Sequence, residues 1–158
     1  MYLYKMELKK NIKISSFVSN ESNTLHFLKR LFYVDFYDRL QFIKSSYKMA
    51  RVDFLILNTE NLKSIVIEVK DWLKRPPTFI SKNKIDNLIK HYDKSFLVLS
   101  HLNTYYWLDV KKIKWEEVEL LKIPNNREDT YDCCYNIEHL LSTDYEDLEL
   151  QMRLDLIT

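Results

Sequence analysis

The sequence predicts a single α/β domain built around a mixed sheet. Three observations predict it: a helical apolar stripe near the start, two β-branched runs around a polar turn, and a second helical stripe followed by two more apolar runs. The 158 residues suit one domain with one core. We divide residues 1–158 into an N-terminal extension over 1–15, a core over 16–112 and an acidic helical extension over 113–158.

The first elements follow from the spacing of apolar residues. An apolar stripe with helical periodicity predicts a helix over roughly residues 16–33, and a short strand is expected over 40–43. The strongest strand signals are the β-branched runs 52–57 and 65–70. The polar stretch 58–63 between them predicts a hairpin.

The next elements complete the core. Arg75-Pro76-Pro77 breaks the chain, and Ser81 can cap a helix that ends near Asp93. Residues 96–99 and 105–108 are predicted to be two further strands. The predicted order is therefore α-β-β-β-α-β-β.

Helical spacing returns near the C-terminus. Apolar residues recur through 115–121 and again through 137–156. We expect C-terminal helices, arranged as a hairpin that packs on the sheet or on a second copy of the chain.

The chain contains no glycine, which excludes several function classes. Dinucleotide-binding fingerprints, Walker A loops, glycine-flanked nucleophile elbows and calcium loops all depend on glycine, so we expect no nucleotide cofactor. Backbone positions with positive φ must then use Asn or Asp. Five asparagines lie between apolar runs: Asn58, Asn61, Asn103, Asn125 and Asn126.

Other features bear on the cellular location. No apolar run approaches the ~18 residues of a membrane span, so we expect no membrane insertion. Cys133 and Cys134 are adjacent and form no metal-binding spacing, and no export segment is recognisable at the N-terminus. The expected location is the reducing cytoplasm.

Charge is unevenly distributed along the sequence. Residues 1–94 hold 18 basic and 10 acidic residues, whereas residues 95–158 hold 6 and 13. One interpretation is an ordinary solvated surface. The other is a polyanion-binding face on the first part, with the acidic part contacting a partner or shielding that face.

Three ionisable residues lie within the two strongest strand signals. Glu68 and Lys70 are two apart and share one face of their strand. If the hairpin is symmetric about residues 58–63, Asp53 lies opposite Glu68. Like charges that face each other need a positive charge between them, which Lys70 or a divalent ion such as Mg2+ can supply. Both an ion cluster and a metal site remain open.

Asp53, Glu68 and Lys70 in this arrangement resemble the signature of the PD-(D/E)xK nuclease superfamily, with Val52 in place of the signature proline. The resemblance covers roughly residues 17–112 and implies a restriction-endonuclease-like α-β-β-β-α-β core. Within the superfamily the chain is most similar to archaeal-type Holliday junction resolvases. Further matches are Phe79-Ile80 before the second helix, the acidic Glu21 in the first helix, and Ser45 or Ser46 in the loop before the hairpin.

This reading predicts a metal-dependent mechanism. Asp53, Glu68, the Val69 carbonyl and Glu21 would hold Mg2+, for which Mn2+ can substitute, and Lys70 would orient or deprotonate the attacking water. Lys84 resembles the residue that many superfamily members aim at the site. Alternatively, Glu21 serves only the helix dipole and Lys84 is a solvated lysine.

Basic residues flank the predicted site and suggest a DNA partner. They are Lys44, Lys48 and Arg51 before Asp53, and Lys74, Arg75 and Lys82 after Lys70. Our first hypothesis is a Mg2+-dependent endodeoxyribonuclease, selective for a DNA structure such as the four-way junction and acting as a homodimer. The second is a nuclease-like fold without catalysis that binds DNA or protein. RNA cleavage is a third outcome.

Overall fold

A computed structural model describes residues 20–44, 52–71, 78–124 and 130–158. The predicted N-terminal extension over 1–15 lies outside these ranges. So do six residues predicted to contact nucleic acid: Ser45, Ser46, Lys48, Arg51, Lys74 and Arg75. Glu21 lies within a described helix, but its side chain is outside what the structure describes.

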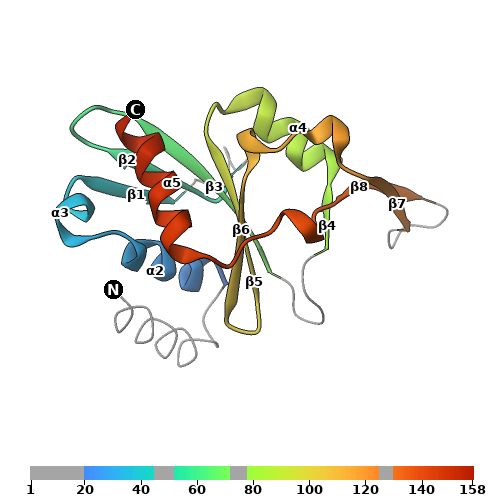
Figure 1. Ribbon diagram of the computed structural model, residues 1–158, viewed down its shortest axis with the longest axis horizontal. Helices are drawn as coiled ribbons and strands as arrows, with labels where there is room; N and C mark the ends of the chain where they lie inside the picture. The colour runs from blue at the N-terminus through green and yellow to red at the C-terminus, as the bar shows by residue number, and fades with distance from the viewer. Residues whose placement is uncertain (1–19, 45–51, 72–77, 125–129) are drawn as a thin grey trace.

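A five-stranded mixed sheet forms the centre of the protein, with strand order β1-β2-β3-β5-β6 (Figure 1). β1, β2 and β3 are antiparallel neighbours, β3 and β5 are parallel, and β5 and β6 are antiparallel. The predicted α/β class and mixed sheet are confirmed. The strands are β1 Leu40–Lys44, β2 Phe54–Asn58, β3 Ser64–Asp71, β5 Ser95–His101 and β6 Thr104–Asp109.

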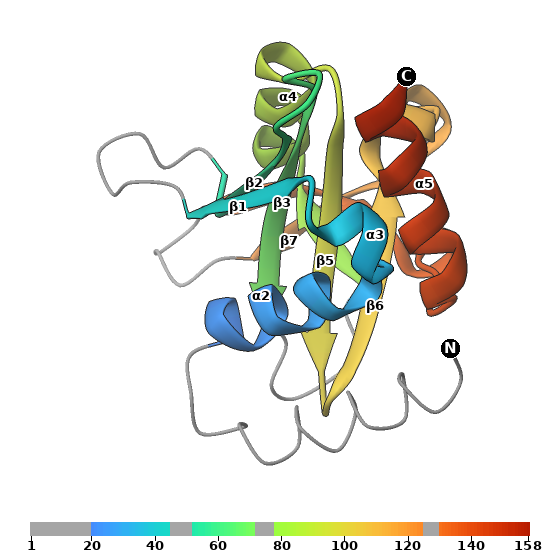
Figure 2. The ribbon, with the colours of Figure 1, turned by 90° about the vertical axis from the view of Figure 1, so that its left-hand side faces the viewer.

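Helices cover both faces of this sheet (Figure 2). α2 (Asn20–Leu31) and α5 (Tyr145–Ile157) pack on one face, and α4 (Lys82–His91) packs on the other. α4 also makes the crossover that parallel strands require, because it lies between β3 and β5 in the chain. Among the described residues, no helix is long and apolar enough to cross a bilayer.

Each face of the sheet has its own apolar core. The α5-side core contains Ile65, Ile67 and Val69 of β3, together with Leu148, Met152 and Leu156 of α5. The α4-side core contains Val66 of β3, together with Ile85 and Leu88 of α4. Because side chains alternate along a strand, Glu68 and Lys70 lie on the same face as Val66, under α4.

The β2–β3 hairpin has the predicted register. Phe54 pairs with Ile67 and Leu57 pairs with Ser64, so facing residue numbers add up to 121, as a turn centred on residues 58–63 requires. This register matters for the site because a slip of one residue would turn Glu68 and Lys70 to the opposite face.

Backbone with positive φ is not confined to asparagine. Asn103 has φ 65°, as expected in a chain without glycine, but Leu62 has φ 63° and Leu102 has φ 47°. Leucine in this region crowds its Cβ against the backbone. The prediction that asparagine or aspartate would take these positions is therefore wrong at two described turns.

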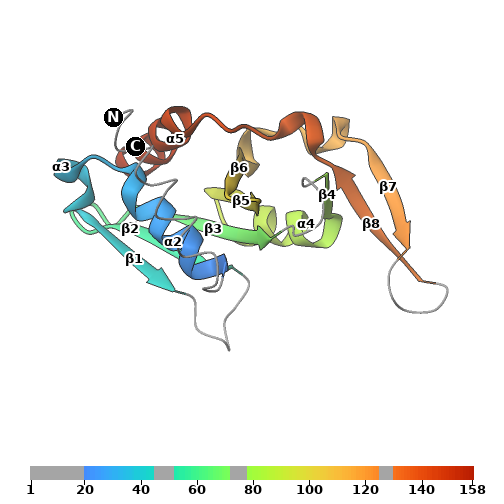
Figure 3. The ribbon, with the colours of Figure 1, turned by 90° about the horizontal axis from the view of Figure 1, so that it is seen from below.

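The predicted helical hairpin at the C-terminus is also wrong. Residues 115–121 form a short 3-10 turn (Trp115–Glu117) and the start of β7 (Leu120–Pro124). β7 pairs with β8 (Tyr131–Asn136), and β8 pairs with β4 (Phe79–Ser81), giving a second sheet of order β4-β8-β7. Figure 3 shows the β7–β8 hairpin projecting from the rest of the molecule.

Contacts of Trp115 explain this difference at residues 115–117. The Trp115 indole donates a hydrogen bond to the Val110 carbonyl at 2.9 Å, and its ring packs on Tyr135 with centroids 4.8 Å apart. These contacts hold a short turn where the apolar spacing alone favoured a helix. Only α5 remains of the predicted C-terminal helices, and it begins at Tyr145, capped by the Asp144 side chain at the Asp147 amide.

Candidate active site

Glu68 is a buried carboxylate near the end of the central strand β3. It is 4% exposed and lies between β2 and β5, where its partner in the parallel pairing is Leu97. Burying a carboxylate among apolar strands is costly unless a charge or hydrogen bonds compensate for it. The neighbourhood of Glu68 must therefore supply a positive charge.

Lys84 supplies that charge. Its Nζ lies 2.8 Å from Oε1 of Glu68, and its side chain remains 30% exposed. Lys84 reaches the strand from the first turn of α4, the helix that covers this face of the sheet. The structure thus places Lys84 in contact with the predicted site, whereas the sequence also allowed a lysine free in solvent.

Asp53 lies beside the residue between Glu68 and Lys70. Its Oδ2 accepts a hydrogen bond from the Val69 amide at 2.7 Å, and its own amide donates to the Ile67 carbonyl at 3.1 Å. The carboxylate is thereby fixed just before the start of β2, next to the Glu68-Val69-Lys70 segment of β3.

The backbone is irregular at Asp53. Val52 packs in the α4-side core and Phe54 in the α5-side core, although residues two apart in a regular strand share a face. The last regular pair of the hairpin is Phe54 with Ile67. The backbone therefore departs from regular strand geometry at Asp53. This departure allows the Asp53 carboxylate to accept a hydrogen bond from the Val69 amide.

A cavity of about 440 Å³ opens beside these residues. We call it the site cavity. It joins the end of β3, the short strand β4 and the first two turns of α4. Its walls carry two lysines, two asparagines, a serine and apolar groups, from Lys70, Phe79, Ile80, Ser81, Asn83, Lys84 and Asn87.

Two other predicted basic residues lie away from the Glu68 carboxylate. Lys44 is exposed at the end of β1. Lys82 pairs with Asp86 on α4 at 2.6 Å, and this hydrogen bond raises the pKa of the Lys82 ammonium above its ordinary value.

The donors available for a metal are carboxylate and carbonyl oxygens. Asp53 directly precedes β2 and Glu68 lies in the neighbouring strand β3, and hard oxygen donors of this kind suit Mg2+. Within the described ranges, no three or more His, Cys, Asp or Glu residues converge as a metal-binding group. The donor chemistry fits Mg2+ provided that the Val69 carbonyl, Glu21 or water completes the ligand set.

Sequence reasoning missed that five further residues line the site cavity: Phe79, Ile80, Ser81, Asn83 and Asn87. Ser81 lies at the N-terminus of α4, as predicted, but its side chain makes no capping hydrogen bond there. The signal for the asparagines was present, because residues 83 and 87 are one helical turn apart and flank Lys84. The role of β4 in forming the cavity could not be read from the chain, since β4 is held by pairing with β8.

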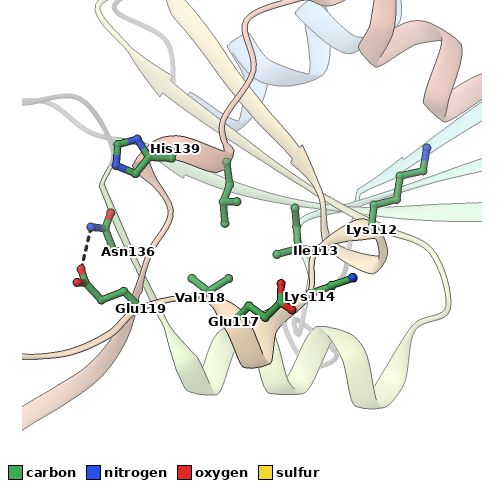
Figure 4. A pocket seen from close by; sticks show the side chains of 9 residues that line it. Lys112, Ile113, Lys114, Glu117, Val118, Glu119, Asn136 and His139 are labelled. Atoms are coloured by element: carbon green, nitrogen blue, oxygen red, sulfur yellow. Dashed lines mark hydrogen bonds between the residues drawn. The ribbon is translucent and has the colours of Figure 1, made fainter.

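A larger cavity of about 550 Å³ lies in the C-terminal part, where residues 112–119 approach residues 136–140 (Figure 4). Polar groups there already interact with each other: the Asn136 amide donates to Glu119 at 3.1 Å, and Lys112 donates to Gln151. None of Asp53, Glu68 and Lys70 lines it. The site cavity is the one next to the candidate catalytic residues, because Lys70 lines it together with Lys84, the ion-pair partner of Glu68.

No family model matches the chain, and no curated protein matches it. Among solved structures, the chain is similar to Hjc, a Holliday junction resolvase from Archaeoglobus fulgidus, an archaeal hyperthermophile. The likeness has a TM-score of 0.47 and 14% sequence identity, and covers 82% of this chain and 95% of that chain.

Proposed function

We propose that the protein is a metal-dependent nuclease that hydrolyses DNA phosphodiester bonds, with Asp53, Glu68 and Lys70 as catalytic residues. The observation that carries the proposal is the hydrogen bond from the Val69 amide to Asp53, at 2.7 Å. This bond holds the Asp53 carboxylate against Val69, the residue between the buried Glu68 and Lys70. Carboxylates and a lysine brought together by neighbouring strands provide the groups that metal-assisted hydrolysis uses.

Mg2+ would be held by Asp53, Glu68 and the Val69 carbonyl, with Glu21 as a further ligand and Mn2+ as a substitute. When bound, the ion supplies Lewis acidity toward the phosphate and lowers the pKa of a bound water. Lys70 would orient or deprotonate that water and offset the charge that develops on the phosphate. Lys84 would hold the buried Glu68 carboxylate in place through their ion pair.

Binding of DNA would depend on phosphate contacts. Lys44, Lys82 and Lys84 are the described contributors, together with Ser45, Ser46, Lys48, Arg51, Lys74 and Arg75 of the sequence. Such contacts give affinity that falls steeply with salt and carry no base sequence information. Because the sequence resembles archaeal-type Holliday junction resolvases, the four-way junction is the structured substrate of choice, and a homodimer would supply the two sites needed for paired cuts.

Cleavage of supercoiled plasmid and of four-way junctions in Mg2+ or Mn2+ tests the proposal. We expect cleavage by the wild type, abolished by EDTA, and at least ~100-fold slower in Asp53→Asn, Glu68→Gln and Lys70→Ala. Lys90→Ala is the matched control, because Lys90 is an exposed lysine in the last turn of α4. Activity that survives Glu68→Gln would refute the assignment.

A second function is favoured by the Glu68–Lys84 ion pair. At 2.8 Å it already compensates the buried charge, as expected of a structural ion pair in a fold that has lost catalysis. The protein would then bind DNA or protein without cutting. Tight, salt-sensitive DNA binding with no cleavage in either metal supports this alternative.

A further inference from the structure

We propose that the site cavity binds one unstacked nucleotide of the DNA substrate, adjacent to the phosphate that is cleaved. The inference rests on the proposed nuclease function and specifies which part of the substrate the site holds. The volume of about 440 Å³ falls within the ~300–1,000 Å³ typical of small-ligand sites. The chemistry of the walls indicates which ligand fits.

One wall suits the face of a nucleobase. Phe79 and Ile80 come from β4, and the Phe79 side chain is only partly buried where it borders the cavity. An aromatic ring at such a position can stack on any base, because every base has a π-face. β4 is anchored by pairing with β8, so this platform is held independently of the ligand.

Another part of the lining suits the edge of a nucleobase. Asn83 and Asn87 are exposed, line the cavity and project from one face of α4, one turn apart. A side-chain amide offers both a donor and an acceptor, the combination that recognises base edges. Lys82 and Asp86 of the same helix segment form an ion pair with each other and do not line the cavity.

Two cations fix where the phosphate would lie. Lys70 and Lys84 line the cavity, and Lys84 contacts Glu68 at 2.8 Å. A nucleotide whose base enters the cavity would therefore have its phosphate near the Glu68 end. Stacked bases in a duplex cannot enter, and unstacking one base costs a few kcal/mol, least where the strand is single or distorted. The cavity thus favours single-stranded or branched DNA over a regular duplex.

Nuclear magnetic resonance titration of the metal-free full chain tests the inference, with 5′-deoxynucleotides, inorganic phosphate and 2′-deoxynucleosides as separate probes. We expect deoxynucleotides to shift the side-chain amide signals of Asn83 and Asn87, and inorganic phosphate to leave them in place. The double variant Asn83→Ala/Asn87→Ala should bind deoxynucleotides about tenfold more weakly. Alanine at exposed helix positions preserves the fold.

Gln41→Ala is the matched control, because Gln41 is an exposed amide on β1 outside the cavity, and its nucleotide affinity should equal that of the wild type. The inference is overturned if inorganic phosphate reproduces every shift, or if the double variant binds nucleotides like the wild type. These readouts involve no cleavage, so a negative result leaves the nuclease test intact. If the protein binds nucleotides but does not cleave DNA, the cavity is a nucleotide-binding site and the proposed nuclease activity is refuted.

Discussion

Glu68 and Lys84 form a single ion pair, 2.8 Å from Oε1 to Nζ, that joins the central strand to the helix covering it. The glutamate is buried and the lysine reaches solvent. This pair links the stability of the fold to the chemistry of the site, because any cation that binds Glu68 shares or replaces the role of Lys84.

Replacing Lys84 with methionine should destabilise the metal-free protein by about 1–3 kcal/mol, since it leaves a buried carboxylate without its partner; partial exposure of the lysine keeps the figure low. Mg2+ should recover part of this loss. Thermal unfolding with and without Mg2+ measures both effects.

The control for this metal effect is the double variant Lys84→Met/Glu68→Gln, in which the carboxylate is also removed. We expect Mg2+ to raise its melting temperature less than that of Lys84→Met. If Mg2+ raises the melting temperatures of the two variants equally, Glu68 is not a metal ligand.

Asp109 predicts a pH effect on stability. Burial raises the pKa of its carboxyl group, although the ammonium of Lys111, 2.7 Å away, opposes the shift. A raised pKa in the folded state means that Asp109 contributes most to stability when protonated, below its unfolded pKa, and that this contribution is lost as pH rises through its folded pKa.

Urea unfolding from pH 3.5 to 8 should therefore show the wild type losing stability relative to Asp109→Asn as pH increases. Asp35→Asn serves as the comparison, because Asp35 is exposed in the first turn of the short helix α3 (Val34–Tyr37). If the difference in the free energy of unfolding between the wild type and Asp109→Asn stays constant with pH, the raised pKa of Asp109 is contradicted.

Leu62→Asn should stabilise the protein by about 0.5–1 kcal/mol. Leu62 is 73% exposed and has φ 63°, so it contributes little packing and holds a backbone conformation that asparagine adopts more readily. Chemical denaturation gives the free energy of unfolding. Leu150→Asn, at an exposed position inside α5, should give no such gain.

Two leucines of α5 offer a paired test of the α5-side core. Leu156 is fully buried, whereas Leu154, two residues earlier on the same helix, is 44% exposed. Leu156→Ala should cost about 2–5 kcal/mol and Leu154→Ala less than about 1 kcal/mol. Similar losses in the two variants, measured by denaturant unfolding, would show that α5 packs differently.

The sequence predicted the parts of the fold that depend on local pattern. Residues 52–57 and 65–70 are β-branched runs around a polar turn, so both the strands and the pairing of Phe54 with Ile67 follow from short-range information. The C-terminal strands were missed because β8 pairs with Phe79–Ser81, far away in the chain, and β7 is a strand through its pairing with β8.

For the candidate site, too, the local pattern predicted some features, and others depend on contacts that the pattern does not show. The pattern around Glu68 and Lys70 identified the segment, and the register brought Asp53 to it. The pattern could not show that Asp53 bonds the Val69 amide, since that contact depends on a local break in strand geometry. Nor could it choose Lys84 over Lys82 as the partner of Glu68, because helix packing decides which lysine faces the strand.

The pairing of β4 with β8 has a consequence for how the protein is made. Phe79 and Ile80 are held by residues 135 and 136, so the wall beside Lys84 has no partner strand until that distant stretch of chain has been synthesised. A nascent polypeptide that ends before residue 131 would contain Asp53, Glu68, Lys70 and Lys84 and still lack the strand that holds Phe79 and Ile80 beside them.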